Sequence, residues 1–181
     1  GWYTPVPEYM GGHVNYGLFV HTFDRLVPPE EFFDSHPEYF SEVEGVRRRN
    51  GSQLCLSNPE VLRILTDRLL KRMRENPRDR IWSVSQNDWT GYCECPKCKA
   101  VADEEGSQAG PILRFVNAVA TETVKEFPEN LIDTLAYWYS LDAPRKAVPH
   151  PNVRVRLCSI RCCQVHGYGT CDHKESARFM K

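Results

Sequence analysis

The sequence predicts an α/β fold built from (β/α) units with a parallel sheet. Short apolar or aromatic segments alternate with amphipathic helical patterns at intervals of roughly 20–50 residues, which is the rhythm of parallel α/β folds. Polar residues gather directly after the predicted strands, where such folds place their sites. With 41% hydrophobic and 26% charged residues, the 181-residue chain has the composition of one soluble globular domain. We therefore expect residues 1–181 to form a single α/β domain.

The first half of the chain contains one predicted strand and two predicted helices. Residues 17–23 ("GLFVHTF") follow a Gly-rich turn and are apolar or aromatic, which favours a buried strand. Prolines ahead of an acid-rich turn within residues 27–40 suit the start of a short helix. The clearest helix lies within residues 57–76, with Asn58 as N-cap and Pro59 as the first helical residue. Its apolar face repeats at spacings of three and four: Val61, Leu62, Leu65, Leu69 and Met73.

The second half predicts three further strands and one further helix. Residues 80–86 are mixed β-branched and aromatic, and a cysteine-rich loop follows them. An amphipathic pattern over residues 111–127 predicts a helix, and residues 131–139 and 152–160 predict strands separated by a Pro-rich loop. Four such strands fit either part of a TIM-like (β/α) barrel or a small doubly wound sheet, and periodicity alone does not choose between them.

Asp88 is the candidate catalytic residue. It follows an apolar strand, and partial burial beside the indole of Trp89 would raise its pKa and suit it to act as a general acid. Glycoside hydrolysis usually needs a second carboxyl group and an aromatic platform under the sugar. Alternatively, Asp88 caps a loop and the aromatic residues belong to the core. The residues that would bind substrate are His21, Gln86, Asn87, Trp89, Tyr92, Tyr137 and Tyr139, and Asp24 lies near His21.

Three cysteines, Cys93, Cys95 and Cys98, form a C-x-C-x-x-C pattern directly after this candidate site. The C-x-x-C spacing lets two thiolates of a tight turn reach one zinc ion, with Cys93 as a third ligand. For the fourth ligand we assign Cys162; Cys163, His166 and Cys171 of the same late loop are alternatives. Disulfides between the two loops, or free thiols, stay open. A thioredoxin-like redox role is disfavoured, because the pattern does not match a C-x-x-C at a helix start close behind a strand.

Composition excludes several classes of partner. The formal net charge is -1 and the cationic runs at residues 47–49 and 71–74 are short, so no nucleic acid is expected. The sequence has no apolar run of about 18 residues, so no membrane span is expected. Phosphate-loop, serine-elbow and H-E-x-x-H motifs are absent from the sequence, and no cofactor is expected for catalysis beyond a possible structural zinc.

Six ordered segments resemble one bacterial family, domain of unknown function 4838. They are "HTFDRLVPPEEFFDSHPEYF", "QLCLSNPEVL", "SVSQNDWTGYCECPKCKAVADEEGS", "GPILRFVNAVA", "TLAYWY" and "PHPNVRVRLCSI". The resemblance implies the barrel portion of large exported proteins of polysaccharide-degrading bacteria, similar in style to α-glucuronidases and β-hexosaminidases. It therefore implies a TIM-like barrel, carbohydrate hydrolysis and a periplasmic or extracellular location. Because the family domain is longer than this chain and both ends look cut, we expect a fragment of such a barrel.

Three functional hypotheses follow. The first is a glycoside-hydrolase-like domain that acts on a complex carbohydrate, with Asp88 as proton donor; as a fragment it need not be active. The second is a non-catalytic carbohydrate-binding scaffold, and a second carboxyl group about 5–10 Å from Asp88 would separate the two. The third is a zinc-braced interaction module. A partial barrel would also expose sheet edges, so we expect either a homodimer of the fragment or edges that the terminal segments cover.

Overall fold

The computed structural model describes residues 15–163, 165–167 and 170–172. The terminal segments, residues 1–14 and 173–181, lie outside the described residues. Among the helices of the described ranges, none is long and apolar enough to cross a membrane.

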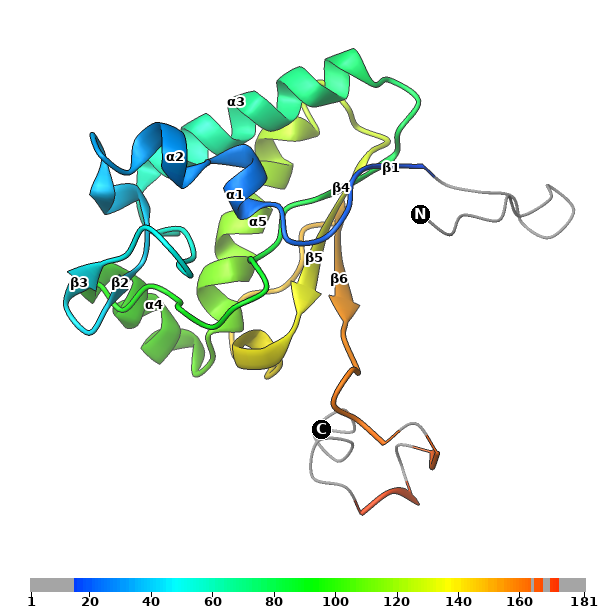
Figure 1. Ribbon diagram of the computed structural model, residues 1–181. Helices are drawn as coiled ribbons and strands as arrows, with labels where there is room; N and C mark the ends of the chain where they lie inside the picture. The colour runs from blue at the N-terminus through cyan, green and yellow to red at the C-terminus, as the bar shows by residue number, and fades with distance from the viewer. Residues whose placement is uncertain (1–14, 164, 168–169, 173–181) are drawn as a thin grey trace, which may run out of the picture.

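A four-stranded parallel sheet is the centre of the fold (Figure 1). Neighbouring strands follow the order β1-β4-β5-β6, and each pair is parallel. The α/β class with a parallel sheet is therefore confirmed. No closed barrel is present among the described residues, so the TIM-barrel prediction is not confirmed. The strands are β1 (Tyr16–Leu18), β4 (Ile81–Ser83), β5 (Leu131–Ala136) and β6 (Val153–Leu157).

β1 and β4 are shorter than the sequence predicted. The chain leaves β1 at Leu18, and His21 adopts a positive φ of 54° before the chain turns into a short helix. Gly17 is needed in β1 because a Cβ atom there would lie 2.2 Å from the Trp82 ring of the neighbouring strand. The polar residues after each strand are therefore in loops, at the carboxyl edge of the sheet.

Helix α3 (Pro59–Glu75) begins where its cap predicts, since the Asn58 side chain accepts a hydrogen bond from the Glu60 amide at 2.9 Å. The other predicted helices are found as α5 (Ala109–Thr123) and two short helices, α1 (Phe23–Leu26) and α2 (Pro29–Phe32). Sequence reasoning missed one helix and one hairpin. The missed or minor elements are η2 (Pro37–Tyr39), β2 (Glu42–Val43), β3 (Val46–Arg47), α4 (Pro96–Glu105) and η3 (Trp138–Ser140).

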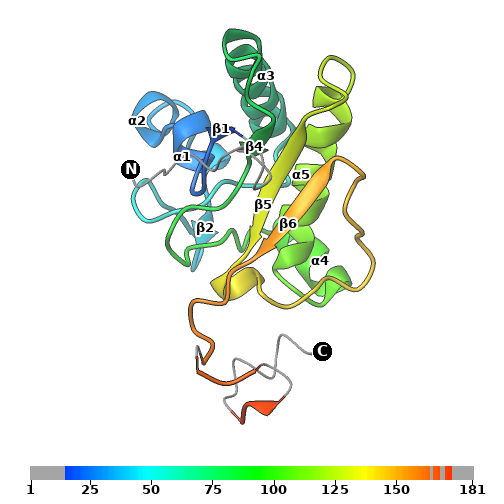
Figure 2. The same cartoon turned by 90° about the vertical axis from the view of Figure 1, so that its right-hand side faces the viewer.

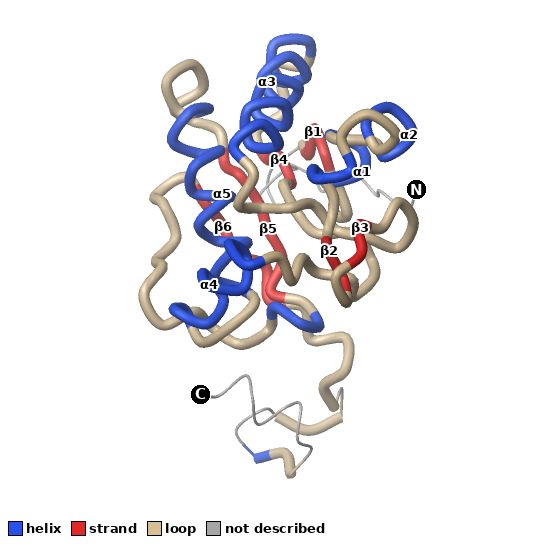
Figure 3. Tube along the Cα trace, turned by 90° about the vertical axis from the view of Figure 1, so that its left-hand side faces the viewer, coloured by secondary structure: helices blue, strands red, loops and turns tan. Residues whose placement is uncertain are grey.

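The described helices cover one face of the sheet. Figure 3 looks onto this face, with α3 and α5 in front of the strands, and Figure 2 looks onto the opposite face, where β5 and β6 lie in front of α5. The main core lies between the layers and includes Leu65 of α3, Val116 of α5 and Trp82 of β4. Burial of these apolar side chains is what fixes the helices on the sheet.

A row of polar side chains crosses the opposite face of the sheet. Ser83, Asp133 and Arg154 are paired in register across β4, β5 and β6, so their side chains share this face. Asp133 is fully buried and accepts hydrogen bonds from Arg154 Nε at 2.9 Å and from Arg156 Nη2 at 2.6 Å. Among the described residues no helix covers this face.

The homodimer expected from the sequence stays a prediction, and the edge strand β6 offers a way to check it. Val155 and Leu157 of β6 are 41% and 53% exposed. We expect the protein to dimerise through this edge, because exposed apolar strands tend to pair. Lysine at both positions should shift the sedimentation coefficient to that of a monomer, whereas Val46→Lys, on an exposed residue of β3, should not. A wild-type protein that sediments as a monomer at high concentration would contradict this expectation.

Candidate functional site

His21, Asp88 and Tyr137 converge at the carboxyl edge of the sheet. They lie in the segments that follow β1, β4 and β5, respectively. The Tyr137 hydroxyl donates a hydrogen bond to Asp88 Oδ1 at 2.9 Å, and His21 Nε2 lies 4.0 Å from the same oxygen. The His21 and Tyr137 rings are 5.9 Å apart between centroids. These three side chains therefore form one group of polar atoms, which we call the strand-end site.

The backbone is strained at two residues of this region. His21 and Trp138 have positive φ angles of 54° and 51°, a conformation that costs non-glycine residues about 1–3 kcal/mol. Strain of this kind persists only where the surroundings hold it, and it clusters at functional sites. At His21 the amide donates to Ser85 Oγ at 2.9 Å, and Nδ1 lies 2.8 Å from the Gln86 carbonyl oxygen. Because a carbonyl oxygen only accepts, Nδ1 carries a proton and Nε2 is directed toward Asp88.

Gln86 and Asn87 are buried, and protein groups satisfy most of their hydrogen bonds. Gln86 Nε2 donates to Ser140 Oγ at 2.7 Å, which joins the β4 loop to η3. The Asn87 amide donates to Gln53 Oε1 at 2.8 Å, and Asn87 Nδ2 donates to Asp24 Oδ1 at 2.7 Å. Both residues therefore hold the loop after β4 in position, and their predicted contact with a substrate stays a prediction.

The predicted aromatic platform is divided into two groups. Tyr137 stacks on Trp138 at 5.3 Å, beside Asp88, and Trp89 is 39% exposed with its Nε1 donating to the Ser52 carbonyl at 2.7 Å. Tyr92 and Tyr139 instead pack on each other at 5.1 Å. They line a small cavity together with Cys93, Cys98 and Ile112, which places them between the cysteine loop and α5.

The predicted burial of Asp88 is wrong, because its side chain is 58% exposed. The carboxyl group that burial does affect is Asp24, at the start of α1. Burial raises the pKa of Asp24, the hydrogen bond from Asn87 opposes the rise, and the negative charge of Glu30 adds to it. Asp24 also donates its amide to Asn87 Oδ1 at 3.2 Å, so the two residues hold each other. The site region therefore has two carboxyl groups in different environments, which sequence position alone did not reveal.

Four cysteines form a second, buried cluster. The sulfur atoms of Cys55, Cys93, Cys95 and Cys98 all lie within 4.8 Å of one another, and each residue is at most 6% exposed. Cys55 Sγ is 3.7 Å from Cys95 Sγ and 3.9 Å from Cys98 Sγ. A tetrahedral zinc with bonds of about 2.3 Å separates its sulfur ligands by about 3.8 Å, whereas a disulfide needs about 2.05 Å. The cluster could therefore hold a metal ion.

Donors from the β2–β3 hairpin reach the sulfur of Cys93. The Glu42 amide donates to Cys93 Sγ at 3.4 Å, and Arg47 Nη1 lies 3.6 Å from the same sulfur. Hydrogen bonds from the thiols of Cys93 and Cys98 lower the pKa of Cys55, and the same contact with Cys55 raises the pKa of Cys98 to about 12. Cationic and amide donors around the sulfurs are the type of outer contact that supports a metal–thiolate centre.

The fourth cysteine of this cluster is Cys55, and the assignment of Cys162 is corrected. The Cys55 amide donates to the Tyr39 carbonyl at 2.8 Å, and this contact holds the segment before α3 against η2. Cys162 instead follows β6. Cys55 has no C-x-x-C neighbour, so spacing carried no signal for it. The C-x-x-C does open a helix, because Cys95 caps α4, so this part of the prediction against a redox role is wrong. The strand before it is not close, since 12 residues separate Ser83 from Pro96.

A family model described as Domain of unknown function (DUF4838) matches residues 4–181. The chain belongs to this family. No curated protein and no solved structure matches the chain. Family membership is thus confirmed, while the resemblance to α-glucuronidases and β-hexosaminidases stays a prediction.

Metal content checks the corrected ligand set. Cys55→Ser should lower the metal bound per purified chain and decrease thermal stability, because a closed four-ligand site loses a ligand. Cys162→Ser should leave the cluster's metal in place, and it is the matched control. Elemental analysis and thermal denaturation measure both effects. Metal loss in Cys162→Ser with none in Cys55→Ser would restore the sequence-based assignment.

The raised pKa of Asp24 predicts a pH-dependent stability difference. A carboxyl group with a raised folded-state pKa stabilises the fold most below its unfolded pKa, and this contribution is lost as the pH rises through the folded pKa. Relative to Asp24→Asn, the wild type should therefore become less stable as the pH rises from about 4 to about 8. Urea unfolding across this range measures the difference. Asp103→Asn on exposed α4 should show no such trend, and a wild type that gains stability over Asp24→Asn with rising pH would refute the argument.

Proposed function

We propose that this domain is glycoside-hydrolase-like and acts on a complex carbohydrate at the strand-end site. The observation that carries the proposal is the convergence of His21, Asp88 and Tyr137, from three separate strand ends, next to the strained backbone of His21 and Trp138. The exposed Asp88 oxygens and His21 Nε2 are hydrogen-bonding groups of the kind that bind sugar hydroxyls. Tyr137, Trp138 and the partly exposed Trp89 supply aromatic surface beside them.

The two carboxyl groups suit different steps of glycoside hydrolysis. Asp24, with its raised pKa, is the better candidate for the proton donor to the leaving oxygen. Asp88, exposed and accepting a hydrogen bond from Tyr137, suits the carboxylate that activates water or stabilises the developing positive charge. The sequence suggested Asp88 as the proton donor, and in this proposal Asp24 takes that role. The non-catalytic scaffold remains the alternative, in which the same groups bind a sugar without cleaving it.

The finer fold proposal is that the sheet is part of a (β/α) barrel. Doubly wound sheets carry helices on both faces and reverse their strand order at one point. Here the parallel strands follow chain order without reversal, and the described helices cover one face. The polar row of Ser83, Asp133 and Arg154 then corresponds to the barrel interior. The family resemblance alone supports a bacterial, periplasmic or extracellular location.

For the cysteine cluster we propose zinc. Four buried thiols at these separations suit a closed, structural tetrahedral site, and soft thiolate ligands favour zinc over harder divalent cations. Because the cluster is buried, a structural brace fits better than an interaction surface. This argues against the zinc-braced interaction module as the main function.

A glycan screen with two aspartate variants tests the carbohydrate proposal. Asp88→Asn should weaken binding of any glycan hit about tenfold, because it removes a charged hydrogen-bond acceptor. If the domain hydrolyses the hit, Asp24→Asn should lower kcat about 10²–10⁴-fold while the glycan still binds. Asp103→Asn is the control for both. Released sugar identifies a hydrolase and binding without release identifies the scaffold, while a hit that binds Asp88→Asn and wild type equally would reject the site.

A further inference from the structure

A second group of metal-ligating residues lies after β6. The ligand atoms of Cys163, His166 and Cys171 all lie within 4.8 Å of one another, and Cys163 Sγ is 3.2 Å from His166 Nδ1. Sequence reasoning treated this loop as a source of one ligand for the first cysteine cluster. Because Cys55 fills that place, the three residues form a group of their own.

The two groups differ in ligand number and exposure. The first has four buried thiols, which is the closed arrangement of structural zinc sites. Among the described residues, the second has two thiols and one imidazole, with His166 exposed and both cysteines half-buried. Sites with three protein ligands leave one tetrahedral position for water or another ligand, and S₂N donors match zinc among the common divalent ions.

We propose that Cys163, His166 and Cys171 bind a second zinc ion whose fourth position is open to an exchangeable oxygen or nitrogen ligand. The proposal does not depend on the carbohydrate function. A bound metal ion would stabilise this segment by joining its two thiols and its imidazole.

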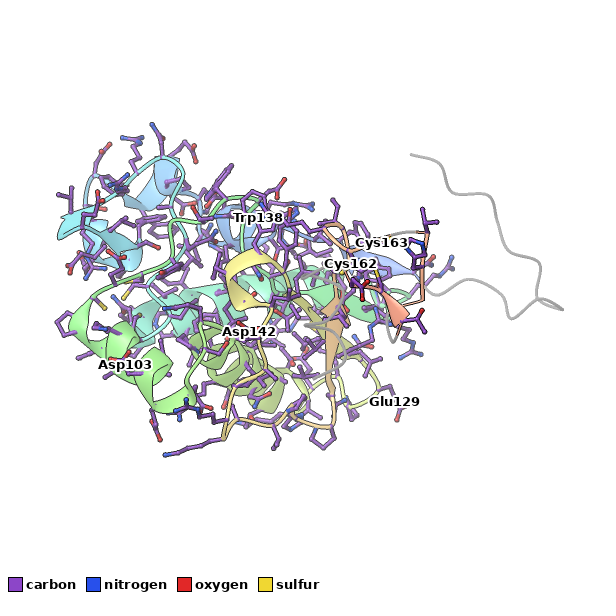
Figure 4. All side chains as sticks on the ribbon, turned by 90° about the horizontal axis from the view of Figure 1, so that it is seen from below. Asp103, Glu129, Trp138, Asp142, Cys162 and Cys163 are labelled. Atoms are coloured by element: carbon purple, nitrogen blue, oxygen red, sulfur yellow. The ribbon has the colours of Figure 1, made fainter. Side chains whose placement is uncertain are left out.

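The position of the loop connects this second site to the strand-end site. The Arg161 guanidinium lies 4.9 Å from the centroid of the Trp138 ring, and Trp138 stacks on Tyr137, whose hydroxyl binds Asp88. Figure 4 shows Trp138 on η3 and Cys162 and Cys163 together on the segment after β6. An anionic or imidazole-like ligand on the second zinc would thus lie at the carboxyl edge of the sheet, where the strand-end site also lies.

Metal stoichiometry tests the proposal on the full chain, purified with a reductant, saturated with zinc and desalted. We expect about two zinc ions per wild-type chain and about one in His166→Ala and in Cys171→Ser, with Cys158→Ser as the two-ion control. Far-UV circular dichroism verifies that each variant is folded. One zinc per wild-type chain at saturation, or two in folded His166→Ala, would overturn the second site.

Cobalt substitution tests the open position separately. In the cobalt-loaded protein, added imidazole should change the visible d–d bands, because it takes the open position of the second site, and this change should be absent in His166→Ala. Bands that do not respond in the wild type would show a closed site and overturn that part of the proposal. An intact mass lower by two hydrogen atoms after air oxidation, with Cys163 and Cys171 joined and no second zinc, would replace the site with a disulfide.

Discussion

The contact on which the site depends is the attachment of one short segment, residues 52–55, to the loop that follows β4. Gln53 accepts from the Asn87 amide at 2.8 Å and donates to the Asn87 and Trp89 carbonyls at 3.1 and 2.6 Å. Cys55, two residues on, lies in the cluster with Cys93, Cys95 and Cys98. The loop from residue 87 to residue 98 is therefore fixed to the same segment at both ends. Asp88 lies in this loop, outside any helix or strand, so these contacts hold it in place.

The ends of β1 and β4 are also joined by a small, buried hydrogen-bond network. The Thr22 hydroxyl donates to the Ser83 carbonyl and accepts from the Ser85 amide, while the Thr22 amide donates to the Ser85 carbonyl. All three residues are fully buried, so their polar groups need partners inside the protein. The network lets the backbone of His21 keep its positive φ, and it thereby directs the imidazole toward Asp88. The hydrogen bonds among Thr22, Ser83 and Ser85 thus offset the conformational cost of the positive φ at His21.

The cysteine cluster and the strand-end site are separate in chemistry but share a support. Tyr92 and Tyr139 pack between them, on the cavity that Cys93 and Cys98 also line, and Ser140 of the same η3 turn binds Gln86. A metal ion in the cluster would consequently stabilise the loop and η3 together. Through these contacts, the buried cluster would help to fix the positions of the loop and η3 at the edge of the sheet.

The parallel α/β class, the long helix α3 and the position of His21, Asp88 and Tyr137 after strands could all be predicted from the sequence. These follow from local patterns: hydrophobic period, the Asn58–Pro59 cap, and the fact that parallel strands end on the same side. Three features needed the three-dimensional structure: Cys55 completes the cluster, Asp88 is exposed, and burial raises the pKa of Asp24. The reason is that ligand proximity and burial depend on contacts between segments far apart in the chain. Cys55 and Cys95 are 40 residues apart, and no spacing rule links them.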